Sequence, residues 1–369
     1  MSAPFDALAL ANAATRALRA YDPGHDLPAL RRRFGSKLVE LGSNESPLGP
    51  SPRAITAIQS MLSDTFRYPD PHGGALKAAL AAQHGIDIAC IALGNGSHEL
   101  LMLIAQCFAD AQTSVLFAEF GFAVFPIAAA AAGARPICVA ALPPDVRMPY
   151  GHDLDAMAAA IDADTRIVYL ANPNNPTGTW FGDAALESFL RRVPVHVLVV
   201  VDEAYAEYVT APEWGSALGL LGRHPNLIVT RTFSKAYALA GLRIGYAVAA
   251  PAVIDVIERL RESFNVNALA LAAAEAALRD RDHVERARAW NASEREWLAA
   301  RLRERGLRAL PSQTNFLLLE FAGDAAPIEH ALCERGVIVR PMAGYGLGHC
   351  LRVSIGLRGD NERLLAALA

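Results

Sequence analysis

The stretch Leu227–Val248 reads LIVTRTFSKAYALAGLRIGYAV, in which two apolar runs flank a cluster of hydroxyls and cations around one lysine, Lys235. Beside apolar strand ends, an amine can be desolvated enough to attack a carbonyl group. The hydroxyls of Thr232 and Ser234 and the forked guanidinium of Arg243 suit a phosphate. An amine beside a phosphate cradle indicates a phosphorylated aldehyde cofactor linked to the lysine. A solvated loop lysine would explain Lys235 taken alone.

Length and composition limit the classes of protein to which this chain can belong. The chain has 369 residues, of which 53% are hydrophobic and 20% are charged, enough for two domains with a large core. A net charge of -4 argues against nucleic-acid binding. No apolar run approaches the roughly 20 residues of a membrane span, and the N-terminal stretch predicts an amphipathic helix rather than a signal peptide. The 5 cysteines form no CxxC pair, which predicts reduced thiols in a cytoplasmic protein, without metal or disulfide.

Strands and helices alternate through most of the chain. Several strands are apolar throughout, as in RIVYLA and HVLVVV, which predicts a mostly parallel α/β sheet with helices on both faces. After a helix over about 251–262 come further helical segments (268–306) and the strands NFLLLEF, VIVRPM and CLRVSIG, which predict a smaller α+β C-terminal domain. The expected domains are an N-terminal arm (1–42), a large cofactor-binding domain (43–258) and a small domain (259–369).

Polar residues follow several of the predicted strands, where open parallel sheets bind ligands. Backbone N–H groups at Asn95 and Gly96, between a strand and a helix, could cradle a phosphate. Phe120 could lie against an aromatic ring, or it could pack in the core. Asn175 could donate to a phenolic oxygen, although an Asn-Pro turn alone would explain it.

Asp202 ends the apolar strand VHVLVVVD, where an unpaired carboxylate would be costly to bury. A protonated pyridine nitrogen would be a suitable partner, and Tyr205 could then reach a hydroxyl on the same ring. A helix N-cap is the alternative role for Asp202. One crossover and one strand separate Asp202 from Lys235, so we expect the two residues at the ends of neighbouring strands.

Arg340 and Arg352 each lie in an apolar strand of the C-terminal domain. A guanidinium in that setting needs an anion. A structural ion pair would satisfy each arginine. The two together favour a carboxylate or phosphate on a substrate.

The series SNESPLGPSP, RYPD, GNGSHELL, NPNNPTG, DEAYAEY, RTFSKAYALAGLRIGY and CLRVSIG resembles the histidinol-phosphate aminotransferase family, which has the fold type I architecture of pyridoxal-phosphate enzymes. The resemblance extends from Tyr21 onward. It implies that Lys235 binds pyridoxal phosphate covalently, that Asp202 pairs with the pyridinium nitrogen, and that Tyr205 and Asn175 contact the ring oxygen. It further implies that Phe120 stacks on the ring. Ala118-Glu119 replaces the family's usual Pro and Thr or Ser, which brings the Glu119 carboxylate near the ring.

The same resemblance implies the remaining contacts. The cofactor phosphate would be held by the backbone at Asn95 and Gly96, by Thr232, Ser234 and Arg243, and by Tyr68 from a partner subunit of a homodimer with shared active sites. Tyr21, Asn44, Arg340 and Arg352 would lie on the substrate side, with Arg352 on the substrate's carboxylate or phosphate.

The implied reaction is transamination between histidinol phosphate and 2-oxoglutarate, giving imidazole-acetol phosphate and glutamate in histidine biosynthesis. Transamination of aromatic amino acids and decarboxylation of threonine phosphate are alternatives on the same scaffold. A non-catalytic sensor or interaction protein is the alternative from another class. The intact set of Lys235, Asp202 and Arg243 argues against it.

Overall fold

The computed structural model describes residues 5–18 and 25–368. Its main element is a seven-stranded sheet of order β2-β8-β7-β6-β5-β3-β4, in which only β8 runs antiparallel to its neighbours. The strands are β2 (Ile91–Gly94), β3 (Ser114–Ala118), β4 (Arg135–Val139), β5 (Thr165–Ala171), β6 (Leu198–Asp202), β7 (Leu227–Thr232) and β8 (Gly245–Ala249). The predicted mostly parallel sheet is confirmed.

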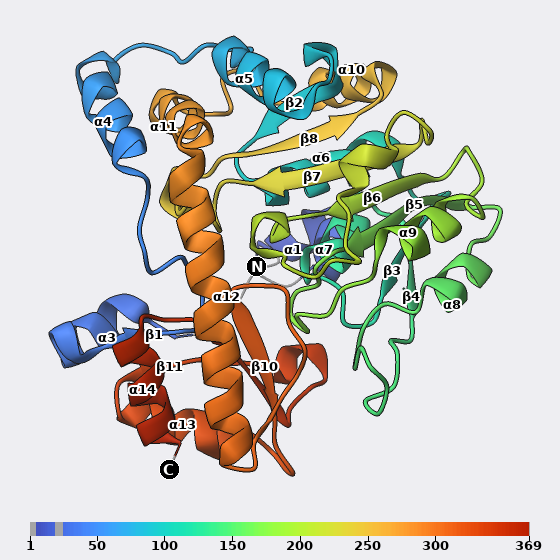
Figure 1. Cartoon of the computed structure of the whole chain (residues 1–369). Coiled ribbons are helices and arrows are strands. Elements are labelled where there is room, and N and C mark those ends of the chain that lie inside the picture. The colour runs from blue at the N-terminus through green and yellow to red at the C-terminus, as the bar shows by residue number, and fades with distance from the viewer. Residues whose placement is uncertain (1–4, 19–24, 369) are drawn as a thin grey trace.

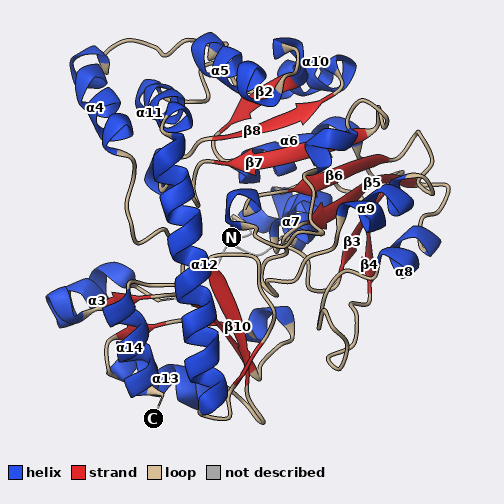
Figure 2. Cartoon of the chain, in the orientation of Figure 1, coloured by secondary structure: helices blue, strands red, loops and turns tan. Residues whose placement is uncertain are grey.

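Helices cover both faces of this sheet (Figure 2). Along β5, Ile167 and Tyr169 pack in the core under α6, α7 and α10, whereas Val168 and Leu170 pack in the core under α8 and α9. This alternation follows from the two-residue period of a strand, and apolar residues on both faces explain the continuous apolar run in the sequence. The helices are α6 (Ser97–Phe108), α7 (Val124–Ala131), α8 (Leu154–Ala159), α9 (Asp183–Leu190) and α10 (Pro251–Leu260).

Most of a second, smaller part follows the large sheet in the chain, and β1 joins it from before that sheet. It holds the antiparallel sheet β12-β13-β10-β9 and the parallel pair β1-β11. The strands are β1 (Val39–Glu40), β9 (Arg308–Ala309), β10 (Phe316–Glu320), β11 (Val337–Ile338), β12 (Arg340–Pro341) and β13 (Cys350–Ser354). They pack with α12 (Arg281–Glu304), α13 (Ala326–Glu334) and α14 (Arg358–Ala367). Figure 1 shows α12 running from the large sheet to the small one. The predicted α+β part is confirmed.

Two features of the packing bear on the domain limits predicted from the sequence. Because β1 pairs with β11, the end of the arm is attached to the smaller part of the molecule. Helix α11 (Ala268–Arg279) buries four alanines in one core with β2, α4 (Pro52–Met61) and α5 (Gly74–His84). By its packing α11 belongs with the large domain, so we propose that the small domain begins within α12 rather than at residue 259.

The arm begins with short helices, α1 (Ala7–Leu10), α2 (Ala13–Ala17) and α3 (Leu27–Phe34). The single N-terminal helix that the sequence predicts is therefore divided. Ala11 and Asn12 are extended, and the Asn12 side chain accepts from the Thr15 N–H to begin α2. Within the described ranges, no helix has both the length and the apolarity needed to cross a bilayer.

Candidate active site

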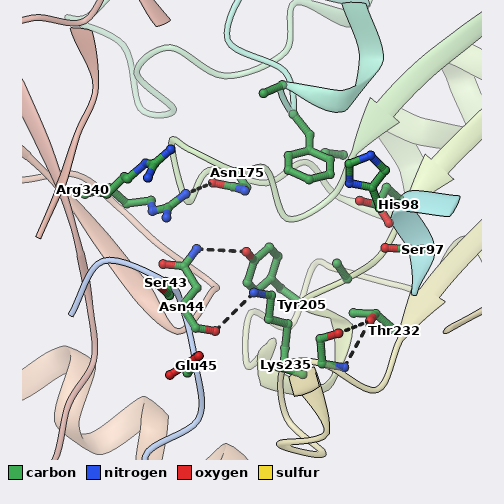
Figure 3. Close-up of a pocket in the computed structure, with 18 of the residues that line it drawn as sticks. Ser43, Asn44, Glu45, Ser97, His98, Asn175, Tyr205, Thr232, Lys235 and Arg340 are labelled. Carbon is green, nitrogen blue, oxygen red and sulfur yellow. Dashed lines mark hydrogen bonds between the residues drawn. The ribbon is translucent and has the colours of Figure 1, made fainter. Parts of the chain in front are cut away.

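A cavity of about 380 Å³ lies at the carboxyl ends of β5, β6 and β7. The turn after β1, the start of α6 and strands β12 and β13 complete its wall (Figure 3). Ten residues selected from the sequence line it, namely Asn44, Asn175, Asp202, Tyr205, Thr232, Ser234, Lys235, Arg243, Arg340 and Arg352. The structure thus brings together segments that are far apart in the chain.

Lys235 follows the end of β7, and its side chain enters the cavity (Figure 3). Its Nζ donates to the backbone oxygen of Asn44 at 3.3 Å and lies 5.7 Å from the centre of the Tyr205 ring. Burial, followed by the positive charges of Arg352 and Arg243, lowers the pKa of Lys235 to about 8. A neutral, nucleophilic amine is therefore accessible close to neutral pH.

Asp202 is the last residue of β6 and is only 4% exposed. Its Oδ1 accepts from the Thr230 hydroxyl at 2.8 Å. Burial raises the pKa of the carboxyl to about 7. Across the described residues, no Lys, Arg or His side chain forms an ion pair with it. A cationic ring nitrogen placed in the cavity would supply the missing charge.

Tyr205 and Asn175 lie where they can meet the same ligand from two sides. The Tyr205 hydroxyl accepts from Asn44 Nδ2 at 3.0 Å, and burial raises the pKa of this phenol to about 12, so it stays protonated. Asn175 Oδ1 accepts from Arg352 Nη1 at 2.7 Å, which leaves the amide nitrogen as the group that can donate to a ligand. Arg352 also donates to the Gly42 carbonyl at 2.7 Å.

An anion cup forms where α6 begins beside β7 and β8. Thr232 donates to the Ser234 hydroxyl at 2.9 Å, and Arg243 Nη1 lies 3.4 Å from the same oxygen. The backbones of β8 and of the start of α6 lie very close together, because a Cβ added at Gly245 would lie 2.6 Å from the Ser97 nitrogen. Hydroxyls, a guanidinium and free N–H groups at a helix N-terminus suit a phosphate.

The contacts predicted for Asn95 and Gly96 are replaced in the cavity wall by residues two positions further along the chain. The Asn95 N–H already donates to the Glu99 carboxylate at 2.5 Å, and neither Asn95 nor Gly96 lines the cavity. Ser97 and His98, the first residues of α6, line it instead. The signal was present in the sequence, since the first N–H groups of a helix that follows a glycine turn have no intrahelical partner.

Phe120 does not line the cavity. Its ring packs edge-on against Tyr150, with centroids 5.5 Å apart, in a cluster of the small sheet. Phe122, two residues further on, lines the cavity. Glu119 also lies outside the lining, and its carboxylate accepts from the Ala141 N–H at 3.3 Å. The Gly121 N–H donates to the Ala118 carbonyl at 2.8 Å to close a turn after β3, and the two aromatic rings pack in different clusters.

Three further predictions concern positions at the edge of the site. Arg340 and Arg352 are register partners on β12 and β13, and both line the cavity. Tyr68 lies outside it, 83% exposed, with its ring stacked on Phe264 at 4.8 Å. Tyr21 lies outside the described residues.

Within residues 5–18 and 25–368, no group of three or more His, Cys, Asp or Glu gathers as metal ligands would.

Pyridoxal phosphate offers a phosphate, a ring nitrogen and an aldehyde to a protein, and this cavity holds a group that suits each of them. The cup suits its phosphate, the buried carboxylate suits its ring nitrogen, and the lysine suits its aldehyde carbon. The fold and the site therefore define the class of pyridoxal-phosphate-dependent transferases.

Comparisons with known proteins agree with this class. The family model for aminotransferase class I and II matches residues 36–368. Histidinol-phosphate aminotransferase 2 of Pseudomonas aeruginosa is 50% identical over 98% of each chain. Histidinol-phosphate aminotransferase 1 of Thiobacillus denitrificans is 49% identical over 96% of this chain and 91% of its own. The solved histidinol-phosphate aminotransferase of Sinorhizobium meliloti, in complex with pyridoxal-5'-phosphate, has a TM-score of 0.85 at 32% identity, over 96% of this chain and 95% of that one.

The chain belongs to the class I and II aminotransferases and, within them, to the histidinol-phosphate aminotransferase family. Its cofactor is pyridoxal phosphate.

Proposed function

We propose that this enzyme transfers the amino group of histidinol phosphate to 2-oxoglutarate in histidine biosynthesis. The observation that carries the proposal is the pairing of Arg340 with Arg352 on neighbouring strands, both lining the cavity that holds Lys235. Two guanidiniums on one wall suit a substrate with a phosphate, and the same wall suits the carboxylates of glutamate and 2-oxoglutarate.

Each polar residue of the cavity has a separate role in such a reaction. When bound, pyridoxal phosphate supplies an electron sink for the electrons released at the substrate's Cα. Asp202 holds a proton at the ring nitrogen, and the amide of Asn175 and the phenol of Tyr205 orient the ring through its oxygen. Lys235 Nζ, with a pKa of about 8, moves the proton at Cα.

We also propose a homodimer in the cytoplasm. Tyr68 is a large aromatic side chain that stands exposed beside the exposed Phe264, away from the cavity of its own chain. An exposed aromatic pair of this kind suits a subunit interface, and Tyr68 would there reach the phosphate cup of the partner subunit. All five cysteines are free, in keeping with a reducing compartment.

The test is a single-turnover absorbance titration of the holoenzyme, following the visible band of the bound cofactor. The amino donors are histidinol phosphate, phenylalanine, threonine phosphate and glutamate. We expect conversion by micromolar histidinol phosphate, with phenylalanine requiring far higher concentrations. An equal or better response to phenylalanine would make the enzyme a general aromatic aminotransferase, and no response to any donor would overturn the proposal.

A further inference from the structure

A buried ion cluster lies directly behind the cofactor-facing ends of β6 and β7. Arg231 donates to Glu203 Oε2 through Nε at 3.0 Å and through Nη2 at 2.7 Å. Its Nη1 donates to Glu207 at 3.1 Å, and Nη2 also donates to the Ser216 hydroxyl at 2.9 Å. The Glu203 side chain is only 1% exposed and that of Arg231 is 11% exposed. The cluster is therefore a desolvated network with short, charge-assisted bonds.

The register of the two strands connects this cluster to Asp202. Asp202 of β6 stands opposite Thr230 of β7, and their side chains bond to each other on the cavity side. Successive residues of a strand point to opposite faces. Glu203 directly follows the end of β6 and Arg231 is the next residue of β7, and their side chains form a second cross-strand pair on the reverse face. Two adjacent cross-strand pairs fix the spacing of the strand ends.

The charge of Glu203 on the reverse face also acts on Asp202 on the cavity face. Glu203 is the residue next to Asp202, and an unbalanced negative charge there would oppose ionisation of the Asp202 carboxyl. Burial lowers the pKa of Arg231, but the carboxylates of Glu203 and Glu207 more than offset it and raise the pKa above its usual range. Arg231 thus stays cationic and balances Glu203. Further bonds to Glu203, from Ala217 N at 2.6 Å and from the Ser216 hydroxyl at 2.7 Å, hold the carboxylate in place.

We propose that Arg231 is a positioning residue for the cofactor: by neutralising and holding Glu203, it keeps Asp202 anionic and aligned with the ring nitrogen. Arg231 does not line the cavity and acts only through the neighbouring strand ends. The inference rests on the contact proposed between Asp202 and the cofactor ring. It assigns a function to an ion cluster that would otherwise serve stability alone.

The test uses holoenzyme reconstituted with cofactor labelled with ¹⁵N at the ring nitrogen, whose chemical shift reports protonation of that atom. In Arg231→Met the unbalanced Glu203 charge should shift the ring nitrogen towards its unprotonated form and weaken cofactor affinity about tenfold. Arg231→Lys should retain most of the wild-type shift. Glu207→Gln is the matched control, because it removes one negative charge beside the same guanidinium outside the two strands, and it should leave the shift unchanged.

The double variant Arg231→Met/Glu203→Gln removes both charges and should recover the protonated ring, even if Arg231→Met folds poorly. A ring nitrogen as protonated in Arg231→Met as in the wild type would overturn the role of Arg231 alone. Failure of the double variant to recover the protonated ring would equally overturn the electrostatic account. An unprotonated ring in the wild type would overturn the Asp202 contact itself, and the role of Arg231 with it.

Discussion

At the scale of the residue, the site depends on two ionisable groups that burial shifts in opposite senses. The pKa of Asp202 rises to about 7 and that of Lys235 falls to about 8. Both shifts oppose the charged form, so the free protein bears a cost, and a cationic ring nitrogen beside Asp202 would relieve the part of it that falls on the carboxylate. Such opposed shifts are typical of sites prepared for chemistry rather than for stability.

Asp202→Asn should stabilise the cofactor-free protein at high pH. The folded pKa of about 7 lies above the value of about 3.9 in the unfolded chain, so the native state binds more protons between these limits and its stability falls as pH rises through them. Above this window the cost is about 4 kcal/mol at most. Urea unfolding of the cofactor-free forms at about pH 5.5 and about pH 8 should show the variant's advantage growing with pH.

The control for this experiment is Asp155→Asn, which alters a carboxylate with an 89% exposed side chain and should show no such pH dependence. A stability difference between Asp202→Asn and the wild type that is the same at both pH values would contradict the role of burial.

Arg352→Lys should impair use of histidinol phosphate although the charge is kept. A lysine cannot reproduce the planar fork that reaches both Asn175 and Gly42, so we expect kcat/KM to fall about tenfold to a hundredfold. Steady-state kinetics would measure the fall, with Arg147→Lys at an 80% exposed position as the matched control. Kinetics equal to the wild type would remove Arg352 from the substrate site.

At the scale of the element, the single antiparallel strand β8 closes the anion cup. It begins at Gly245, where an added Cβ would lie 2.6 Å from the Ser97 nitrogen and 2.7 Å from the Arg231 carbonyl oxygen. The start of α6 can approach the end of β7 only because this position has no side chain. The cup is thus a property of three elements together.

Gly245→Ala should therefore weaken cofactor binding while leaving most of the fold in place. A methyl group at this position must push the first turn of α6 away from Arg243 and Ser234, and we expect about a tenfold rise in the cofactor dissociation constant. Fluorescence or absorbance titration of the cofactor-free protein would measure it. Gly241→Ala is the matched control, since nothing lies within 4 Å of a Cβ there. Equal affinities in the two variants would exclude the close approach as a determinant of binding.

At the scale of the whole molecule, the proposed homodimer makes each site depend on two chains. Tyr68→Phe keeps the ring that stacks on Phe264 at 4.8 Å but removes the hydroxyl. Sedimentation should show a dimer for the wild type and the variant, whereas the variant should bind the cofactor about tenfold more weakly because one hydrogen bond to its phosphate is lost. A wild-type monomer with full cofactor occupancy would disprove the shared site.

Much of this organisation was predictable from the sequence. Apolar strand runs alternating with helices predicted the parallel sheet, and polar residues after those runs predicted that Asp202 and Lys235 would meet at one edge. Period and strand direction are local properties, so they can be read along the chain. The covalent role proposed for Lys235 and the phosphate role proposed for Arg243 rest on residue chemistry and on resemblance to a family, and both residues line the cavity.

Only the tertiary structure decided which neighbours complete the site. In the structure Phe122 rather than Phe120 lines the cavity, and the Asn95 N–H donates to Glu99. Helix α11 packs with the large domain. The structure also shows the Arg231–Glu203 pair behind Asp202. The amino-acid sequence by itself determined which elements form and which side chains stand at their ends, because both follow from local periodicity and residue type. Which side chains touch across those ends depends on the packing of segments far apart in the chain, which no local pattern records.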